Sequence, residues 1–329
     1  MRIFRPGDEG PEIRDIQDRL AALTHDVRED PPGVFGDATL AAVRRFQAAR
    51  SLQVDGLVGP DTWGQLVEAG FLLGDRTLYL HAPHMRGDDV RGLQRKLNAL
   101  GFDAGREDGV LGPVTDQAIR EFQRNVGEPA DGVVGLHTIE TLERMRPVED
   151  AASRAVVREG EEMRLLPPGL TGRTVAIDPG PAGAGVDPGL DVAHALAAAI
   201  EDTGGTAVLL RGEDQDPAAH DRALAANAAG ASICVAFRID GPPGPGTCAS
   251  FGNDRTHSPA GERLARMIAQ ELHASFGEPV RTQRLTVAML RETSMPAVQV
   301  TPPAGADPVG VAGAVAAGVL RYATEPAAD

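Results

Sequence analysis

The stretch Asp55-Gly-Leu-Val-Gly59 decides the fold of the first half of the chain, because it recurs as Asp131-Gly-Val-Val-Gly135. In both copies a threonine, Thr62 or Thr138, stands three residues after the last glycine of this motif. Residues 13–66 and 90–142 align along their whole length at an offset of 76 or 77 residues. So many matched positions at one offset indicate a tandem structural repeat.

Each copy is predicted to form three short helices. In the first copy the apolar positions 13, 16, 20 and 23, and then 40, 43 and 46, have the spacing of one buried helix face. Asp-Gly and Gly-Pro dipeptides separate the helices, since glycine supplies positive φ and proline suits the first helical turn. Pro32 stands where the second copy has Asp108, which predicts a different central turn in the first copy.

These repeats resemble the peptidoglycan-binding repeat of cell-wall hydrolases over nearly all of residues 10–145. Backbone geometry alone explains the Asp-Gly turns, so we interpret Asp55, Gly56 and their counterparts as turn formers. The alternative is a groove for glycan or peptide near Trp63, because aromatic faces pack against sugars. The second copy has no tryptophan at that place, so such a groove would be present once.

The composition, with 42% hydrophobic and 24% charged residues among 329, is that of a globular protein. The net charge of −15 argues against nucleic acid and anionic membranes as partners, because phosphate binding needs clustered lysine and arginine. No apolar run approaches the roughly 18 residues that span a bilayer, and no signal-peptide core is visible, which predicts a cytoplasmic protein. Cys234 and Cys248 lack zinc-site spacing and are predicted to be buried core thiols.

The sequence predicts four parts and a fold of the α + α/β class. Residues 1–73 and 74–146 are expected to form the two helical repeats, 147–171 a linker without periodicity, and 172–324 an α/β domain. Short apolar strands that alternate with helices predict a mainly parallel sheet covered on both faces. The predicted strands are 173–177, 206–210, 232–237, 287–290 and 297–300.

Several landmarks follow one another in the second half: Ile177-Asp-Pro-Gly180, Arg211, Arg222, Ala226-Asn227 and Met295-Pro-Ala-Val-Gln-Val300. In this order they resemble the zinc-dependent N-acetylmuramoyl-L-alanine amidases of the type-3 family. The resemblance covers residues 172–323. It implies a zinc ion held by two histidines and a glutamate, with a bound water whose pKa falls to about 7, and a second glutamate that moves protons.

The residues that match the family's four functional positions are different here. Pro181 replaces the first histidine, Gly185 approximately the glutamate ligand, Arg238 the second histidine and Thr301 the catalytic glutamate. Proline has no donor side chain, and arginine is a permanent cation that would repel Zn²⁺. We therefore expect no zinc, no other cofactor and no catalytic residue.

A displaced metal site is the alternative. Asp187, Asp191 and His194 have spacings that would share one helix face, although Asp187-Pro-Gly189 is more typical of a helix start. We expect no metal there. Elsewhere, a solvated helix face is predicted at His220, Asp221 and Arg222.

Within this family the arrangement resembles the CwlM-type proteins of actinobacteria, which share two repeats, no signal peptide and an arginine like Arg238. The resemblance implies a non-catalytic cytoplasmic regulator of peptidoglycan precursor synthesis. Its expected partners are cytoplasmic proteins of that synthesis, with a muropeptide or glycan as a further ligand. Two alternatives are an amidase with an unrecognised metal site and a simple peptidoglycan-binding protein.

The candidate ligand-binding residues are Arg238, Asp178 and Trp63. At a strand end without zinc, Arg238 would place a fixed positive charge that suits a carboxylate or a phosphate of a docking partner. The alternative is an internal ion pair between Arg238 and either Asp178 or Asp240.

Overall fold

The computed structural model describes residues 2–145, 168–182, 187–239, 244–253 and 255–325. The chain divides into two compact units, Met1–Val157 and Arg158–Asp329. Most of the predicted linker 147–171 lies outside the described residues.

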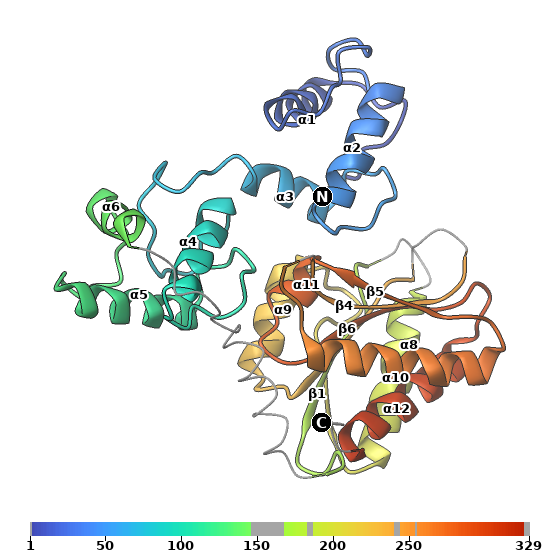
Figure 1. Cartoon of the computed structure of the whole chain (residues 1–329). Helices are drawn as coiled ribbons and strands as arrows, with labels where there is room; N and C mark the ends of the chain where they lie inside the picture. The colour runs from blue at the N-terminus through green and yellow to red at the C-terminus, as the bar shows by residue number, and fades with distance from the viewer. Residues whose placement is uncertain (1, 146–167, 183–186, 240–243, 254, 326–329) are drawn as a thin grey trace. The chain divides into compact units, whose positions relative to one another are not determined.

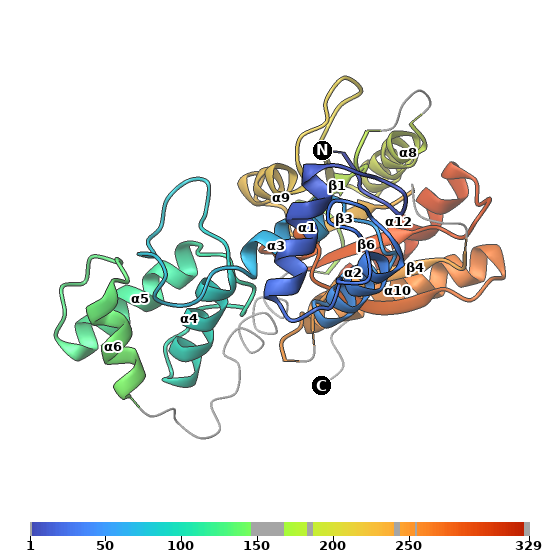
Figure 2. The same ribbon diagram turned by 90° about the horizontal axis from the view of Figure 1, so that it is seen from above.

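The first unit contains the predicted three helices in each copy, drawn in blue to green in Figures 1 and 2. Proline at the first turn starts several of them, because its missing N–H would have no helical partner there. Each helix buries one apolar face, such as Ile13, Ile16 and Leu20 in the first. The helices are α1 (Pro11–Ala22), α2 (Asp37–Ala49), α3 (Pro60–Glu68), α4 (Asp88–Ala99), α5 (Pro113–Val126) and α6 (Leu136–Arg144).

A buried glutamine ties each turn of the repeats to the helix before it. In the turn of the first copy, Gln47 Oε1 accepts from the Gly56 N–H at 2.8 Å. Its Nε2 donates to Asp55 Oδ1 at 2.8 Å, to the Leu57 carbonyl at 2.9 Å and to Thr62 Oγ1 at 3.1 Å. Equivalent glutamine contacts occur at Gln17, Gln94 and Gln123. The turn motif therefore occurs four times, a finer repetition than the alignment at 76 or 77 residues indicates.

The second unit is built on a six-stranded sheet with the order β2-β1-β3-β6-β4-β5. All neighbouring strands are parallel except β4 and β6, which confirms the mainly parallel sheet. The strands are β1 (Thr174–Asp178), β2 (Thr206–Leu209), β3 (Ile233–Phe237), β4 (Thr247–Phe251), β5 (Arg281–Leu285) and β6 (Ala297–Thr301).

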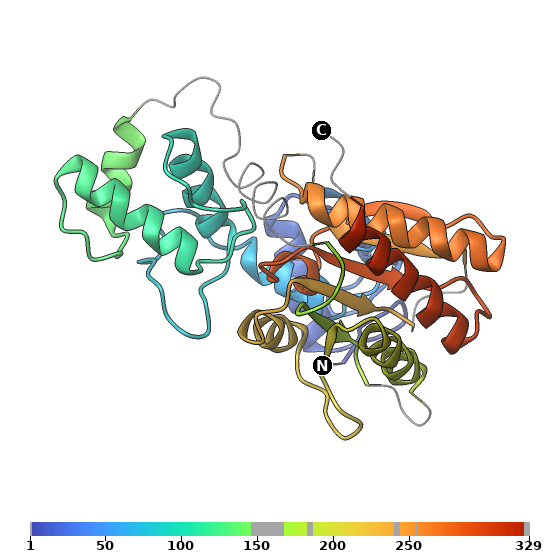
Figure 3. The same cartoon turned by 90° about the horizontal axis from the view of Figure 1, so that it is seen from below.

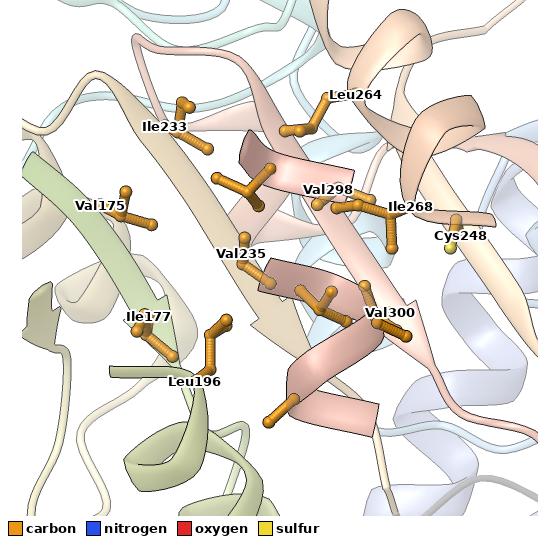
Figure 4. Close-up of a cluster of buried hydrophobic side chains, with 14 of the residues drawn as sticks. Val175, Ile177, Leu196, Ile233, Val235, Cys248, Leu264, Ile268, Val298 and Val300 are labelled. Carbon is orange, nitrogen blue, oxygen red and sulfur yellow. The ribbon is translucent and has the colours of Figure 1, made fainter. Parts of the chain in front are cut away.

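Helices pack on both sides of this sheet (Figures 1 and 3). The helices α8 (Pro188–Asp202), α10 (Pro259–Phe276) and α12 (Pro308–Thr324) share one apolar core with alternate strand residues. Figure 4 shows this core, in which Val175, Val235 and Val298 come from neighbouring strands. The helices α9 (Ala219–Ala228) and α11 (Ala288–Arg291) contact each other, and α11 also packs against β6.

The sequence-based assignment of one strand was wrong. Residues 287–290 do not form a strand, because Ala288–Arg291 form the short helix α11. A short apolar run has the same composition in a strand and in a buried helical turn, so periodicity does not separate them. The prediction also missed β4 and β5, the latter because its sequence Arg-Thr-Gln-Arg-Leu is mostly polar and exposed at the sheet edge.

Among the helices that the structure describes, none combines the length and the apolar character that crossing a bilayer requires. The two cysteines are buried and reduced, Cys234 on β3 and Cys248 on β4. Burial raises the pKa of both thiols, because the thiolate would lose its hydration.

Candidate functional site

The loop after β1 lies directly against the end of β3. Gly180 has a φ of 83°, in the left-handed region that favours glycine. A Cβ at this position would come within 2.6 Å of the Phe237 carbonyl oxygen. The close approach places Pro181, the next residue, beside the point where the chain leaves β3.

Asp178 at the end of β1 is buried and paired with an arginine. Arg222 Nε lies 2.8 Å from Asp178 Oδ1, which also accepts from the Gly180 N–H at 2.9 Å. Burial raises the pKa of Asp178, and the Arg222 guanidinium and the Gly180 N–H act in the opposite direction. The prediction of a solvated face was wrong for Arg222, which is 5% exposed and anchors α9 to the end of β1.

A second buried arginine, Arg211, contacts both Gly180 after β1 and Asp187 before α8. Arg211 Nε donates to the Gly180 carbonyl at 2.6 Å, and its Nη2 lies 2.6 Å from Asp187 Oδ2. Asp187 Oδ1 in turn accepts from the Leu190 N–H at 3.1 Å and caps α8. Asp187 therefore serves as a helix cap and an ion-pair partner in this structure.

Arg238 and Thr301 lie side by side at the carboxyl ends of adjacent strands. β3 and β6 pair in parallel with Phe237 opposite Val300, and the Arg238 N–H donates to the Val300 carbonyl at 2.9 Å. Both residues line a pocket of about 250 Å³. The structure thus brings Pro181, Arg238 and Thr301 to one end of three neighbouring strands, while Gly185 lies outside the described residues.

This set of residues does not fit a zinc ion. A catalytic zinc site needs three protein ligands with lone pairs, supplied by histidine, cysteine or carboxylate side chains. Pro181 offers no side-chain donor atom, Arg238 offers only N–H donors with a fixed positive charge, and Thr301 offers one neutral hydroxyl. Within the described ranges, no three or more His, Cys, Asp or Glu side chains gather in a way that could hold a metal ion.

Trp63 lies on α3 in the first unit and is partly buried. The guanidinium carbon of Arg19 stands 5.2 Å from the centroid of its ring, in cation–π geometry. Arg19 is itself held by Asp15 at 3.1 Å. One face of the indole is therefore covered by the protein's own arginine.

The structure also reveals a polar group in the second copy that the sequence analysis overlooked. The Glu128 side chain is only 8% exposed, and its Oε2 accepts from the Thr138 hydroxyl at 2.8 Å. His137 Nε2 lies 3.6 Å from Glu128 Oε1. The signal was present in the repeat alignment, because the matching residue in the first copy is the apolar Leu52.

Comparison with known families agrees with this division of the chain. Residues 9–66 and 86–142 each match the peptidoglycan binding domain, and residues 175–302 match the N-acetylmuramoyl-L-alanine amidase family. Among solved structures, the amidase Ami1 from Mycobacterium smegmatis is similar, with 19% identity, a TM-score of 0.42 and coverage of 47% of this chain and 98% of that chain.

Two curated relatives show how far the similarity extends along the chain. CwlL, an amidase of Bacillus licheniformis, is 31% identical over 157 residues, which are 41% of this chain and 44% of that protein. The N-acetylmuramoyl-L-alanine amidase CwlM of Mycobacterium tuberculosis is 34% identical over 330 residues, covering 90% of this chain and 80% of that protein. Since this similarity spans both repeats and the α/β domain, the chain belongs to the CwlM family of proteins, with two peptidoglycan-binding repeats and an amidase domain.

Proposed function

We propose that this protein is a non-catalytic member of the amidase family that binds cytoplasmic partners and regulates the synthesis of peptidoglycan precursors. The observation that carries the proposal is the trio of Pro181, Arg238 and Thr301 at the strand ends. The family places zinc and its catalytic glutamate there, and none of the three can take over those roles.

The surroundings of these residues support a retained platform. Arg222 with Asp178, and Arg211 with Asp187, fix the end of β1 and the start of α8 with ion pairs whose arginines are buried. Removing one partner of a buried pair costs about 3–5 kcal/mol, so these pairs keep the strand ends ordered. An ordered, concave face at the carboxyl ends of parallel strands is the usual place for binding in α/β proteins.

The first test compares metal content and activity. Purified full-length protein, prepared without chelators, is expected to contain far less than one zinc per chain and to release no peptide from muramoyl-peptide substrates. A matched control carries Pro181→His, Gly185→Glu, Arg238→His and Thr301→Glu together. Stoichiometric zinc in the unmodified chain would contradict the proposal. It would favour the alternative, an amidase with another metal site, which is the activity for which CwlM of Mycobacterium tuberculosis is named.

The second test concerns regulation. Depleting the protein from its host is expected to change the cellular pool of nucleotide-linked peptidoglycan precursors, and the unmodified gene should restore that pool. The Arg238→Ala variant, shown by thermal melting to be folded, is expected to restore it poorly and to capture fewer enzymes of precursor synthesis. Full restoration by this variant would move the binding role to the repeats and favour a simple peptidoglycan-binding protein.

A further inference from the structure

The pocket at the carboxyl ends of β3 and β6 has the chemistry of a small anion site. We propose that it binds a small carboxylate, the size of an amino acid or of the end of a short peptide. The inference rests on the proposed function, because it assigns a new ligand to the strand ends where a zinc ion would otherwise act.

The positive charge of the pocket comes from Arg238. Among the described residues that line it, Arg238 is the one with an ionisable side chain, and Thr301 lines it from the end of the adjacent strand β6. A guanidinium has five N–H donors in a planar fork, so it can bind a carboxylate with two of them while serving contacts within the protein with the others. The site therefore favours a planar anion that accepts two parallel hydrogen bonds.

The walls of the pocket are apolar and stiff. Pro302, Pro303 and Pro308 contribute rings with fixed φ, and Val192 and Val311 contribute branched side chains from α8 and α12. A volume of about 250 Å³ is below the range of roughly 300–1,000 Å³ that is common for drug-sized ligands. The pocket thus suits a ligand with a short apolar body.

Two helix starts at the rim limit the charge of that ligand. α8 and α12 begin at Pro188 and Pro308, both in the pocket wall. Their capping carboxylates differ, because the charge of Asp187 is balanced by Arg211 at 2.6 Å, whereas Asp307 adds a negative charge next to the rim. One arginine near an acidic cap favours a singly charged carboxylate over a doubly charged phosphate.

The test uses full-length protein stripped of metal on a chelating resin, and measures saturation-transfer NMR and calorimetry with three probes. The probes are N-acetyl-D-alanyl-D-alanine, its C-terminal amide and inorganic phosphate. The free acid is expected to bind at least about tenfold more tightly than the amide or phosphate, since one charge-assisted contact is worth a factor of this size. Arg238→Gln should abolish the preference, and Arg281→Gln, on the exposed edge strand, should leave it unchanged.

The proposal is overturned if the acid and the amide bind equally, if none of the probes binds saturably, or if Arg238→Gln retains the preference. Should Arg238→Gln fail to fold, Ala306→Phe fills the same pocket and is expected to block binding. Removing metal beforehand separates this result from a failure of the proposed function, because zinc-dependent binding would disappear in metal-free protein while an arginine-dependent site keeps its affinity.

Discussion

The two repeats share a backbone plan and differ in the polar groups placed on it. In both, a buried glutamine closes the last turn, Gln47 in the first copy and Gln123 in the second. Position 52 in the first copy is a leucine that is 3% exposed, whereas the second copy buries the Glu128 carboxylate at the matching place. The contacts of Gln47 and Gln123 with their turns, which we call the glutamine clamp, are therefore common to both copies, and the remaining differences adapt each copy separately.

The difference at Leu52 and Glu128 extends to their neighbours. The Leu52 N–H donates to the main-chain carbonyl of Gln47 at 2.9 Å, and the Glu128 N–H donates to the main-chain carbonyl of Gln123 at 2.8 Å. Thr138 then turns its hydroxyl to Glu128, whereas Thr62 in the first copy accepts from Gln47 instead. The two copies therefore use the same threonine for different partners.

The largest effect is expected from exchanging the residue types at this position. In the first copy Asp61 stands at the position of His137 in the second copy. Leu52→Glu would therefore bury a carboxylate near a second carboxylate, and it should destabilise the first copy by about 2–5 kcal/mol. Glu128→Leu should change the second copy by less than about 1 kcal/mol, because a fitted apolar group replaces a partly satisfied one. Hydrogen–deuterium exchange of α3 and α6 measures the two copies separately. Equal losses from both changes would contradict the assignment.

The next effect tests whether the glutamine clamp is equally important in both copies. Gln47→Ala and Gln123→Ala leave the buried N–H groups of Gly56 and Gly132 without an acceptor, and each should cost about 2–3 kcal/mol in its own copy. Gln117→Ala on the exposed face of α5 serves as the control and should have almost no effect. Protection against proteolysis reports the loss, and a clamp variant as stable as the control would show that the turns form without it.

The third prediction concerns a cap that only the first copy has. Burial opposes the ionisation of Asp30, but hydrogen bonds from Thr39, Ala38 and Gly36 outweigh burial and lower its pKa. The second copy has Arg106 at the matching position. A lowered folded-state pKa means that the stabilisation is present above the unfolded value, about 3.9, and is lost as the pH falls through the folded value.

Asp30→Ala should therefore cost the first copy about 1 kcal/mol at pH 7, a typical loss for a helix cap. The gap between this variant and the unmodified protein should close as the pH is lowered from 5 towards 3, a range set by the carboxyl pKa. Exchange rates of α2 amides over that range provide the measurement. A gap that stays constant with pH would mean that Asp30 acts without its charge.

The smallest effect should come from the aromatic residue that only the first copy carries. Arg19→Ala uncovers one face of Trp63, and we expect a loss of less than about 1 kcal/mol for an exposed cation–π contact. Trp63 is the single tryptophan of the chain, so its fluorescence reports the change directly. If the uncovered ring is a sugar platform, soluble chitooligosaccharide should then quench it, whereas an unchanged spectrum with sugar leaves Trp63 a packing residue.

The sequence by itself determined the repeats, the α + α/β order and the presence of Pro181, Arg238 and Thr301 just after or at the ends of predicted strands. These features depend on local rules, such as the positive φ of glycine in Asp-Gly turns, the spacing of apolar residues and the lone pairs of each side chain. They can be recognised in the sequence without knowing which segments contact one another in the fold.

Tertiary structure decided the partners of the buried charges. Asp178 meets Arg222, and Asp187 meets Arg211, across 44 and 24 residues of chain in which no spacing rule applies. It also decided that 288–291 form a helix and that the polar segment 281–285 is a strand, since an edge strand gains its backbone partners from β4 and needs little apolar character of its own. Long-range pairing, and not local preference, fixes these contacts.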